Sequence, residues 1–551
     1  MSPLAVVDQA PLQVRALFAR FNQVNDPAVS EFTGSIPEKF ADAVNRVASQ
    51  KIQTGDFVLR NRAVLKSFIK KFHSEAGTLT EHVRSSIELL DDPAARIVVS
   101  THQPNLFAYG RVFKKIVLLE TLKDAIEELD RGGSSRIVNL FLVVDHDFVD
   151  ESWVRLAQLP SMQHSSGVME LRLPVSESKR WQMVCNMPVP SELVVHNWKR
   201  QVKSWIKSTA GADMRSVFID NLEQFWQHVE ASYERAKSHA DLNSFLMSRV
   251  VNGAWNYSTL FVRLSEISSV FEDGFAFLIS NSARYSDALR RAENMFMSCG
   301  IDTGVSPSSY LHAPVWVHCR CGSKASVKIV SKNGDLVLAG PCISCKKELE
   351  LNLGRQNNLD LGGCNNIHDL SPRAIPIPLL LARDLGISCY ASGTGGIGYL
   401  VDGSIVSGKL GIRLPLTLIW SSRDIYEGIG QRKAAAAMPS ENNIELYLQL
   451  LEKQNAEYEK RMRPLLSMRA EKIRAGEPID ELLSQLFELK EGQRRIRQQI
   501  SLAKKIRNIV SLSPCFIDYA VNFGMARTEQ AWRNHLVKDG RLALPVVFQP
   551  T

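Results

Sequence analysis

The stretch Ile137-Val-Asn-Leu-Phe-Leu-Val-Val144 decides the fold class, because it is a nearly continuous apolar run that follows a helical pattern. A shorter apolar run, Arg96-Ile-Val-Val99, comes first, and residues 107–129 repeat apolar side chains at helical spacing. Arg131-Gly-Gly-Ser-Ser135 then interrupts the chain. Strand, helix, break and strand predict a βαβ unit with a right-handed connection and parallel strands. We expect its second strand to be buried on both faces of the sheet.

Length and composition are those of an ordinary globular protein. The chain has 551 residues, of which 45% are hydrophobic and 23% charged, so we expect about two to four folded units. The longest uncharged apolar stretches, 137–144 and 374–382, are far shorter than the roughly 20 residues of a membrane helix. The first residues lack a basic segment followed by an apolar one, which a signal peptide requires. We therefore expect a cytoplasmic protein with no membrane partner.

Three further regions have a readable pattern. Residues 1–95 and 221–300 are predicted to be mostly helical. Within 374–420, the stretch Cys389-Tyr-Ala-Ser-Gly-Thr-Gly-Gly-Ile-Gly398 predicts a strand followed by a glycine turn into a helix. This pattern continues the α/β character of the first unit.

Two long helices are predicted over residues 441–475 and 478–511, joined by a turn that contains Gly476. Their spacing favours an extended antiparallel hairpin of the coiled-coil type. Pro464 should kink or break the first helix, because proline removes one helical hydrogen bond. An exposed stripe of Ile444, Leu448 and Leu451 would need a cover. We therefore expect a homodimer formed through this hairpin.

The same hairpin holds most of the excess positive charge. The whole chain has 66 basic and 58 acidic residues, and residues 451–510 have 14 Lys or Arg against 9 Asp or Glu. A solvated helical face explains this balance better than a surface for an anionic partner. Nucleic acid is therefore not an expected partner, although a nucleotide- or RNA-associated binding protein remains the alternative function.

Polar side chains follow both strands of the predicted βαβ unit. His102 and Gln103 follow the first strand, and Asp145, His146 and Asp147 follow the second. Because the carboxyl ends of parallel strands share one edge, these side chains should meet there. His146 between two aspartates should favour its cationic form and could serve as a general base, with the aspartates orienting it or holding a metal. The alternative is that the histidines are hydrogen-bonded core residues and the aspartates cap the strand ends.

Four segments occur in this order: Thr-His-Gln-Pro-Asn-Leu-Phe, Asp-His-Asp-Phe, Ser-Gly-Thr-Gly-Gly-Ile-Gly-Tyr and a late hairpin. In these patches, over residues 90–520, the chain resembles the cysteine-adding enzymes of bacillithiol biosynthesis (BshC). The resemblance implies a Rossmann-like core, a coiled coil used for dimerisation, and amide formation between cysteine and glucosaminyl-malate. It implies catalytic roles for Asp145, His146 and Asp147. It also implies a substrate-binding set: Thr101, His102, Gln103, Asn105, Gly393, Gly395 and Tyr399.

This chain departs from the family's pattern at three positions. His102 stands in place of a Gln, Asn105 in place of a Gly, and Gly396 in place of a Glu. Loss of a carboxylate changes which charge a site can hold, so the acceptor need not be the bacillithiol precursor. ATP with Mg²⁺ is a candidate co-substrate, and a scaffold with altered catalysis is a further alternative.

Two close cysteine pairs predict a metal site. Cys319 and Cys321 precede Cys342 and Cys345 in a short segment rich in turn residues. Four thiolates at this spacing suit the tetrahedral coordination of Zn²⁺, with a redox dithiol pair as the alternative. A closed four-cysteine site leaves no position for a substrate, so the zinc should be structural. The other five are expected to be buried, inert thiols: Cys185, Cys299, Cys364, Cys389 and Cys515.

These patterns together predict an α/β protein with a Rossmann-like parallel sheet, an inserted zinc ribbon and a C-terminal helical coiled-coil hairpin. The expected boundaries are 1–310 for the N-terminal helices and first part of the core, 311–354 for the ribbon, 355–435 for the second part of the core, 436–515 for the hairpin and 516–551 for the C-terminal segment.

Overall fold

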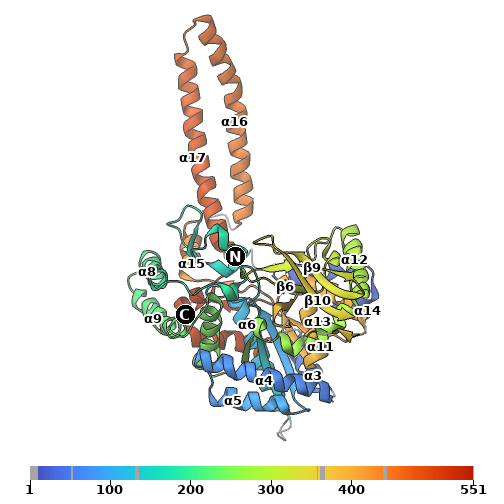
Figure 1. Ribbon diagram of the computed structural model, residues 1–551. Coiled ribbons are helices and arrows are strands. Elements are labelled where there is room, and N and C mark those ends of the chain that lie inside the picture. The colour runs from blue at the N-terminus through green and yellow to red at the C-terminus, as the bar shows by residue number, and fades with distance from the viewer. Residues whose placement is uncertain are drawn as a thin grey trace.

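The protein, seen here as a computed structural model, has an α/β body from which two paired helices project as a long arm (Figure 1). The structure describes residues 10–50, 54–130, 136–355, 358–359, 361, 367–438 and 443–549. The predicted break at 131–135 and Cys364 lie outside these residues.

A parallel sheet of five strands forms the centre of the body, in the order β14-β13-β1-β2-β5. Its strands are β1 (Arg96–His102), β2 (Ile137–Val143), β5 (Leu260–Arg263), β13 (Cys389–Ser392) and β14 (Leu416–Ile419). The chain places β2 and β5 on one side of β1, and then crosses to place β13 and β14 on the other side. The predicted βαβ unit is confirmed, because β1 pairs with β2 in parallel and α6 (Gly110–Leu129) connects them.

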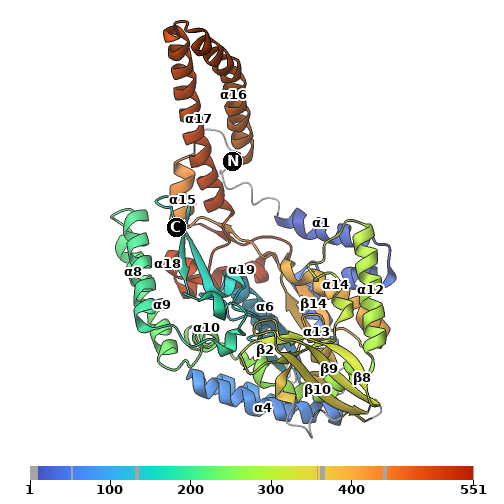
Figure 2. The same ribbon diagram turned by 45° about the horizontal axis from the view of Figure 1, so that its top comes forward.

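Helices cover both faces of this sheet, and alternate strand residues enter two separate cores (Figures 1 and 2). Phe141 belongs to the core that α6 shares with the C-terminal helices, whereas Leu140 and Leu142 belong to the opposite core. Every residue of β2 is buried, as predicted for a strand covered on both faces.

The first core is closed by helices from the start, middle and end of the chain: α3 (Phe40–Ala48), α8 (Glu192–Thr209), α9 (Arg215–Tyr233), α10 (His239–Ser248), α18 (Phe516–Phe523) and α19 (Met525–Lys538). The second core is closed by α1 (Ala10–Asn22), α2 (Pro27–Ser35), α4 (Asp56–Ala76), α5 (Glu81–Glu88), α11 (Glu272–Ser280), α12 (Ser282–Ser298), α13 (Pro376–Leu385) and α14 (Ile397–Leu410). Shorter elements complete the body: α7 (Ser152–Arg155), α15 (Ile429–Ala436) and the strand pairs β3 (Leu156–Pro160) with β4 (Val168–Arg172) and β15 (Ile425–Tyr426) with β16 (Val547–Phe548).

Residues 221–300 are mostly helical, as predicted, and the edge strand β5 lies between these helices. It has only four residues and pairs with β2 from Leu260 to Arg263. A side chain of α4 holds the strand in place: His73 Nε2 accepts a hydrogen bond from the Phe261 amide at 2.9 Å. The other ring nitrogen, Nδ1, lies 2.8 Å from Thr78 Oγ1. A strand this short has no periodicity of its own, so its place depends on such contacts.

Burial lowers the pKa of His73 to about 3, so acid should destabilise the fold through this residue. Between pH 6.5 and 3 the unfolded chain binds a proton that the folded chain excludes, so this stabilisation is present above pH 6.5 and decreases as the pH falls. At pH 5 the difference amounts to about 2 kcal/mol. We expect His73→Gln to reduce the loss of unfolding free energy between pH 7 and 5 in urea titrations, and His196→Gln, at an exposed histidine, to leave it unchanged.

The cysteine-containing segment folds as two small antiparallel sheets against the second core. One has the order β12-β6-β7 and the other β11-β10-β9-β8. Their strands are β6 (Val315–His318), β7 (Lys324–Ser326), β8 (Lys328–Lys332), β9 (Asp335–Pro341), β10 (Glu348–Arg355), β11 (Asn358–Leu359) and β12 (Leu370–Pro372). Buried apolar side chains such as Val317 and Leu338 attach the segment to the body.

The arm consists of α16 (Ile444–Ala475) and α17 (Asp480–Ser511), which lie side by side (Figures 1 and 2). Two expectations about it are corrected. Of the kink or break predicted at Pro464, the break does not occur, because the helix continues past it. The stripe of Ile444, Leu448 and Leu451 is buried within one chain, against Ala503, Ile506 and Ile509 of α17, so it needs no partner to cover it.

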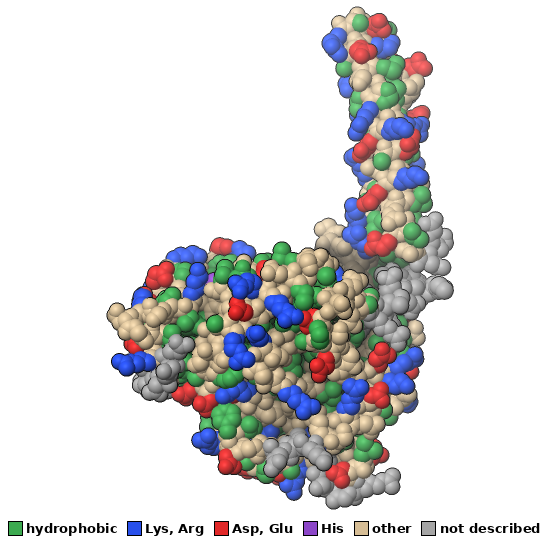
Figure 3. Space-filling model, turned by 90° about the vertical axis from the view of Figure 1, so that its right-hand side faces the viewer, with side chains coloured by type: hydrophobic (Ala, Val, Ile, Leu, Met, Phe, Trp, Pro, Cys, Tyr) green, Lys and Arg blue, Asp and Glu red, His purple; other side chains and the backbone are tan. Residues whose placement is uncertain are grey.

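Acidic and basic side chains are interspersed along the visible face of the arm (Figure 3). Several of them pair across the two helices, including Lys504 with Glu452 at 3.2 Å and Arg497 with Glu459 at 3.3 Å. Part of the charge of this region is therefore paired within the arm, which is typical of a solvated helical face.

Candidate functional site

The order of the strands reverses between β1 and β13, because the chain extends the sheet in one direction from β1 and then in the other. In open parallel sheets, ligands bind outside the carboxyl ends of the strands at such a reversal. Here those ends lead into the loop of residues 103–109 and the glycine turn of residues 393–396. The topology therefore places two of the predicted loops beside each other.

Thr101 and Tyr390 join the two strands at this point through a hydrogen bond of 2.7 Å between their hydroxyl groups. Below them, the Lys115 ammonium group donates to the Thr101 carbonyl oxygen at 2.6 Å. Burial lowers the pKa of Lys115 to about 7, and Arg111 lowers it further. Burial beside both cations also lowers the pKa of His102 well below its usual value, so that ring is neutral.

Sequence reasoning did not select Lys115 as a site residue. A signal existed, because Lys114 and Lys115 stand together on a helix whose other buried residues are mostly apolar. The two lysines differ in their partners. Lys114 pairs with Asp424 at 2.7 Å in the core, whereas Lys115 is bonded to a backbone carbonyl and has no carboxylate partner among the described residues.

A small cleft lies beside this junction, at the base of the arm, and its accessible volume is about 30 Å³. Arg111, Ser422 and Arg423 line it. Desolvation lowers the pKa of Arg111, Tyr109 opposes that shift, and Arg423 adds to it. Asp424 also lines the cleft, but it is paired with Lys114, so the two arginines favour an anionic ligand.

Asp147 is the aspartate of the second loop that faces the site. It accepts a hydrogen bond from the Gln103 amide at 2.9 Å, which confirms the predicted meeting of the two strand ends. Its other oxygen lies 3.8 Å from the ammonium nitrogen of Lys324, and its side chain is 28% exposed. Asp147 is therefore held between an amide and a cation and still reaches solvent.

Lys324 comes from β7 of the cysteine-containing segment and was not selected from sequence. Its ammonium group donates to the His146 carbonyl oxygen at 2.7 Å and lies 4.6 Å from the ring centres of Phe148 and Trp316. Burial lowers the pKa of Lys324 to about 8, while Asp147 opposes that shift. The inserted segment thus supplies one charged group of the site.

The roles predicted for Asp145 and His146 are not supported by their positions. Asp145 is buried and accepts hydrogen bonds from the Ser265 amide at 2.9 Å and the Ser265 hydroxyl at 2.6 Å, so it caps the loop after β5. Burial raises the pKa of Asp145 to about 6. Burial near Lys324 and His318 lowers the pKa of His146 well below its usual value. The predicted cationic form is therefore wrong, because neither aspartate side chain offsets the burial.

The glycine turn lies near the same edge. The Thr394 amide donates to the Ser422 hydroxyl at 3.1 Å, which connects the turn to the cleft. A Cβ atom at Gly398 would lie 1.9 Å from the Thr303 carbonyl oxygen, so only glycine fits there. Burial raises the pKa of Tyr399, and the charge of Asp147 in the second loop raises it further.

The remaining members of the predicted binding set differ in access. Gly393 is partly exposed and Gly395 is exposed, so the turn is open to a ligand. Asn105 is buried, and neither atom of its amide has a hydrogen-bond partner within the described structure. The loop of residues 103–109 therefore contains one polar group that the protein itself leaves unpaired.

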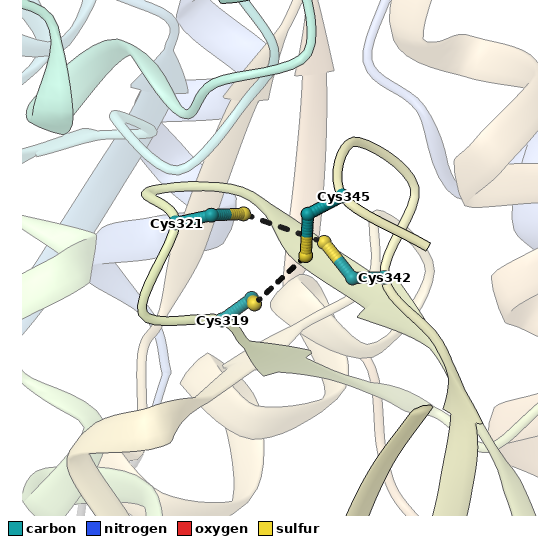
Figure 4. A group of neighbouring side chains, drawn as sticks. All are labelled: Cys319, Cys321, Cys342 and Cys345. Atoms are coloured by element: carbon teal, nitrogen blue, oxygen red, sulfur yellow. Dashed lines mark hydrogen bonds between the residues drawn. The ribbon is translucent and has the colours of Figure 1, made fainter. Parts of the chain in front are cut away.

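The four predicted metal ligands converge on one point (Figure 4). Their sulfur atoms all lie within 4.8 Å of one another, with 3.7 Å between Cys319 and Cys345 and 3.5 Å between Cys321 and Cys342. Zn²⁺ bound tetrahedrally at about 2.3 Å would separate sulfurs by about 3.8 Å. The Lys347 amide lowers the pKa of Cys345 to about 7, which favours the thiolate that a metal requires. The donor set fits a zinc ion.

The other described cysteines mostly match the expectation of inert thiols. Burial raises the pKa values of Cys185, Cys389 and Cys515. Cys299 is exposed, which corrects the expectation that it is buried, because it follows the last turn of α12 at the surface.

No family model matches the chain, and no curated protein matches it. No helix in the described residues combines the length and the apolar character needed to cross a membrane.

Proposed function

We propose that the protein is a carbon–nitrogen ligase similar to BshC, which joins an amino acid, cysteine in the first instance, to the amine of a small anionic acceptor. One observation carries the proposal: Lys115 and the Arg111–Arg423 cleft lie at the point where the strand order reverses, and Asp147 is bonded to Gln103 at the end of the same strand, β1. The strand order, with helices on both faces, supports a Rossmann-like core.

The cationic groups are the proposed acceptor-binding part of the site. Arg111 and Arg423 are suited to hold carboxylate or phosphate oxygens in bidentate fashion. Lys115 lies where the first loop begins and would be stabilised as a cation by such an anion. Glucosaminyl-malate carries two carboxylates and one amine, so it is the acceptor to test first.

Asp147 takes the role first given to His146, because it is the strand-end carboxylate that reaches solvent. ATP with Mg²⁺ is the proposed activating co-substrate, and its phosphoryl or adenylyl group is transferred to the amino acid carboxylate. The acceptor nitrogen then attacks the activated carbonyl carbon, forming the C–N bond as the C–O bond to phosphate or AMP breaks. Asp147 accepts the ammonium proton that this attack releases.

The direct test is incubation of the purified protein with cysteine, glucosaminyl-malate and ATP, followed by mass spectrometry. We expect a product with the summed mass of the two substrates less one water, and one equivalent of ADP or AMP. Substitution of serine for cysteine tests the choice of amino acid. If no condensed product forms with any amino acid while the protein is folded, the proposed ligase function is wrong.

The cysteine cluster is proposed to be the zinc centre of a ribbon-like module. A bound Zn²⁺ would supply structural cross-linking of the two cysteine pairs. Lys324 follows Cys321 by three residues, and its carbonyl oxygen accepts from the Ile343 amide next to Cys342 at 3.1 Å. The cluster thereby positions the β7 strand that brings Lys324 to Asp147.

We also propose that the arm, as a coiled coil, forms a homodimer. Large apolar side chains remain exposed on it after α16 and α17 pair, among them Leu446 at 62% and Phe487 at 67% exposure. Burial of this surface would favour association. We expect a dimer mass by light scattering at micromolar concentration, and a monomer for Phe487→Glu. Val537→Glu, at an equally exposed residue of α19, is the matched control and should stay dimeric. A monomeric parent protein would contradict the proposal.

A further inference from the structure

A second pocket lies between α12, α14 and the loop of residues 301–310, and its accessible volume is about 230 Å³. Its wall is mainly apolar: Leu289, Phe296, Ile301, Val305 and Tyr310. This volume is at the small end for pockets that bind organic molecules, so it suits a compact ligand. No lysine or arginine is among the residues that line it in the described structure.

Asp402 is the polar group of this wall that lacks a full set of partners. Its side chain is on α14, 3% of the residue is exposed, and its Oδ2 atom has no hydrogen-bond partner among the described residues. Thr303 provides one hydrogen bond to the carboxyl group. A buried carboxylate oxygen without a partner is costly, so a donor from a ligand would stabilise it.

Glu293, the second carboxylate of the pocket, already accepts a hydrogen bond from the protein. Both oxygens of Glu293 lie 3.1 Å from the Ser308 amide, which donates to them. Asp302 is exposed. Asp402 is therefore the group available to a buried ligand, and the charge of the pocket is negative.

We propose that this pocket binds a small molecule with an apolar body and an ammonium group, the ammonium group pairing with Asp402. The apolar wall would take the body of the ligand, and the unpaired oxygen would accept a charge-assisted hydrogen bond. Burial raises the pKa of Asp402 to about 7, and a bound cation would favour its ionised form. This inference is independent of the proposed ligase activity.

The pocket also adjoins the candidate site. Thr303, which bonds Asp402, contacts Gly398 at the start of α14 through its carbonyl oxygen. Tyr399 is the next residue, and it precedes Asp402 by three positions, close to the same side of the helix. A ligand in the pocket would therefore contact the helix that follows the glycine turn.

The test uses 2-phenylethylamine and its uncharged counterpart 2-phenylethanol as probes, with calorimetry on the full-length protein. We expect the amine to bind at least about tenfold more tightly than the alcohol, a difference of about 1.4 kcal/mol. Asp402→Asn should remove that preference. The matched control Asp302→Asn changes an exposed carboxylate of the same pocket and should retain it. Val305→Phe should weaken both probes by filling the cavity.

Three results would overturn the proposal: no binding of the amine to the parent protein, equal binding of amine and alcohol, or an unchanged preference in a folded Asp402→Asn variant. Thermal unfolding shows whether each variant is folded. If Asp402→Asn does not fold, the preference of the parent protein for the amine and the effect of Val305→Phe still decide the question.

Discussion

Removal of the metal from the cluster of Cys319, Cys321, Cys342 and Cys345 is expected to unfold residues 315–355 while the parallel sheet stays folded. The sulfurs fit a tetrahedral zinc ion, and apparent binding energies of structural zinc sites are about 10–16 kcal/mol at neutral pH. The segment depends on this energy, because the cluster joins the turn before β7 to the turn after β9, and several of its strand residues are exposed. We expect about one zinc per chain by elemental analysis, and a local loss of amide-exchange protection after chelation or in Cys342→Ser.

Cys299→Ser is the matched control for this experiment, because Cys299 is an exposed cysteine outside the cluster. It should keep both the zinc content and the protection of residues 315–355. Loss of the segment should also free Lys324 from its contacts at the end of β2, so catalysis and binding should fall together. Absence of zinc from freshly purified, reduced protein would show that the four cysteines serve another purpose.

Asp147→Asn is expected to reduce the rate of amide formation by roughly 10²-fold or more while leaving the melting temperature within a few degrees. The side chain is partly exposed, and asparagine can still accept the hydrogen bond from Gln103, so the fold loses little. The amide cannot accept the proton of the attacking amine, so the chemical step should slow. The measurement is the rate of product formation by mass spectrometry, together with thermal unfolding.

Asp145→Asn provides the contrast, since Asp145 is two residues away in the same loop but buried. The Ser265 amide and hydroxyl donate to the two oxygens of the Asp145 carboxylate, and asparagine keeps only one of these oxygens. The substitution should therefore lower the free energy of unfolding by about 1–3 kcal/mol. Its folded fraction should retain most of the activity. If Asp145→Asn abolished turnover in the folded protein and Asp147→Asn had no effect, the assignment of the two aspartates would be reversed.

Several parts of this molecule follow from local sequence patterns. The β1–α6–β2 unit is predicted by apolar periodicity, because a strand buried on both faces must be apolar throughout. The arm is predicted by two long helical patterns around Gly476. The metal cluster is predicted by the spacing of two cysteine pairs, since each pair makes its own tight turn. In each case the determining interactions lie within a few residues or one supersecondary unit.

The candidate site depended on contacts that local patterns do not contain. Sequence reasoning placed Gln103 beside Asp147 correctly, because both follow neighbouring parallel strands. It could not show that Asp145 turns toward Ser265, 120 residues away, or that Lys324 reaches the His146 carbonyl from 178 residues away. The stripe on α16 looked unpartnered for the same reason, although α17 covers it.

The sequence by itself therefore determined the alternation of strands and helices, the paired arm and the identity of the four clustered cysteines. Only the tertiary structure decided which polar groups are buried as caps, which cations gather at the reversal of the strand order, and which carboxylate, Asp402, lacks a partner in a pocket. The physical reason is that periodicity records which face of an element avoids water, whereas the charge and reactivity of a side chain depend on its neighbours. Those neighbours come from segments that only the packed chain brings together.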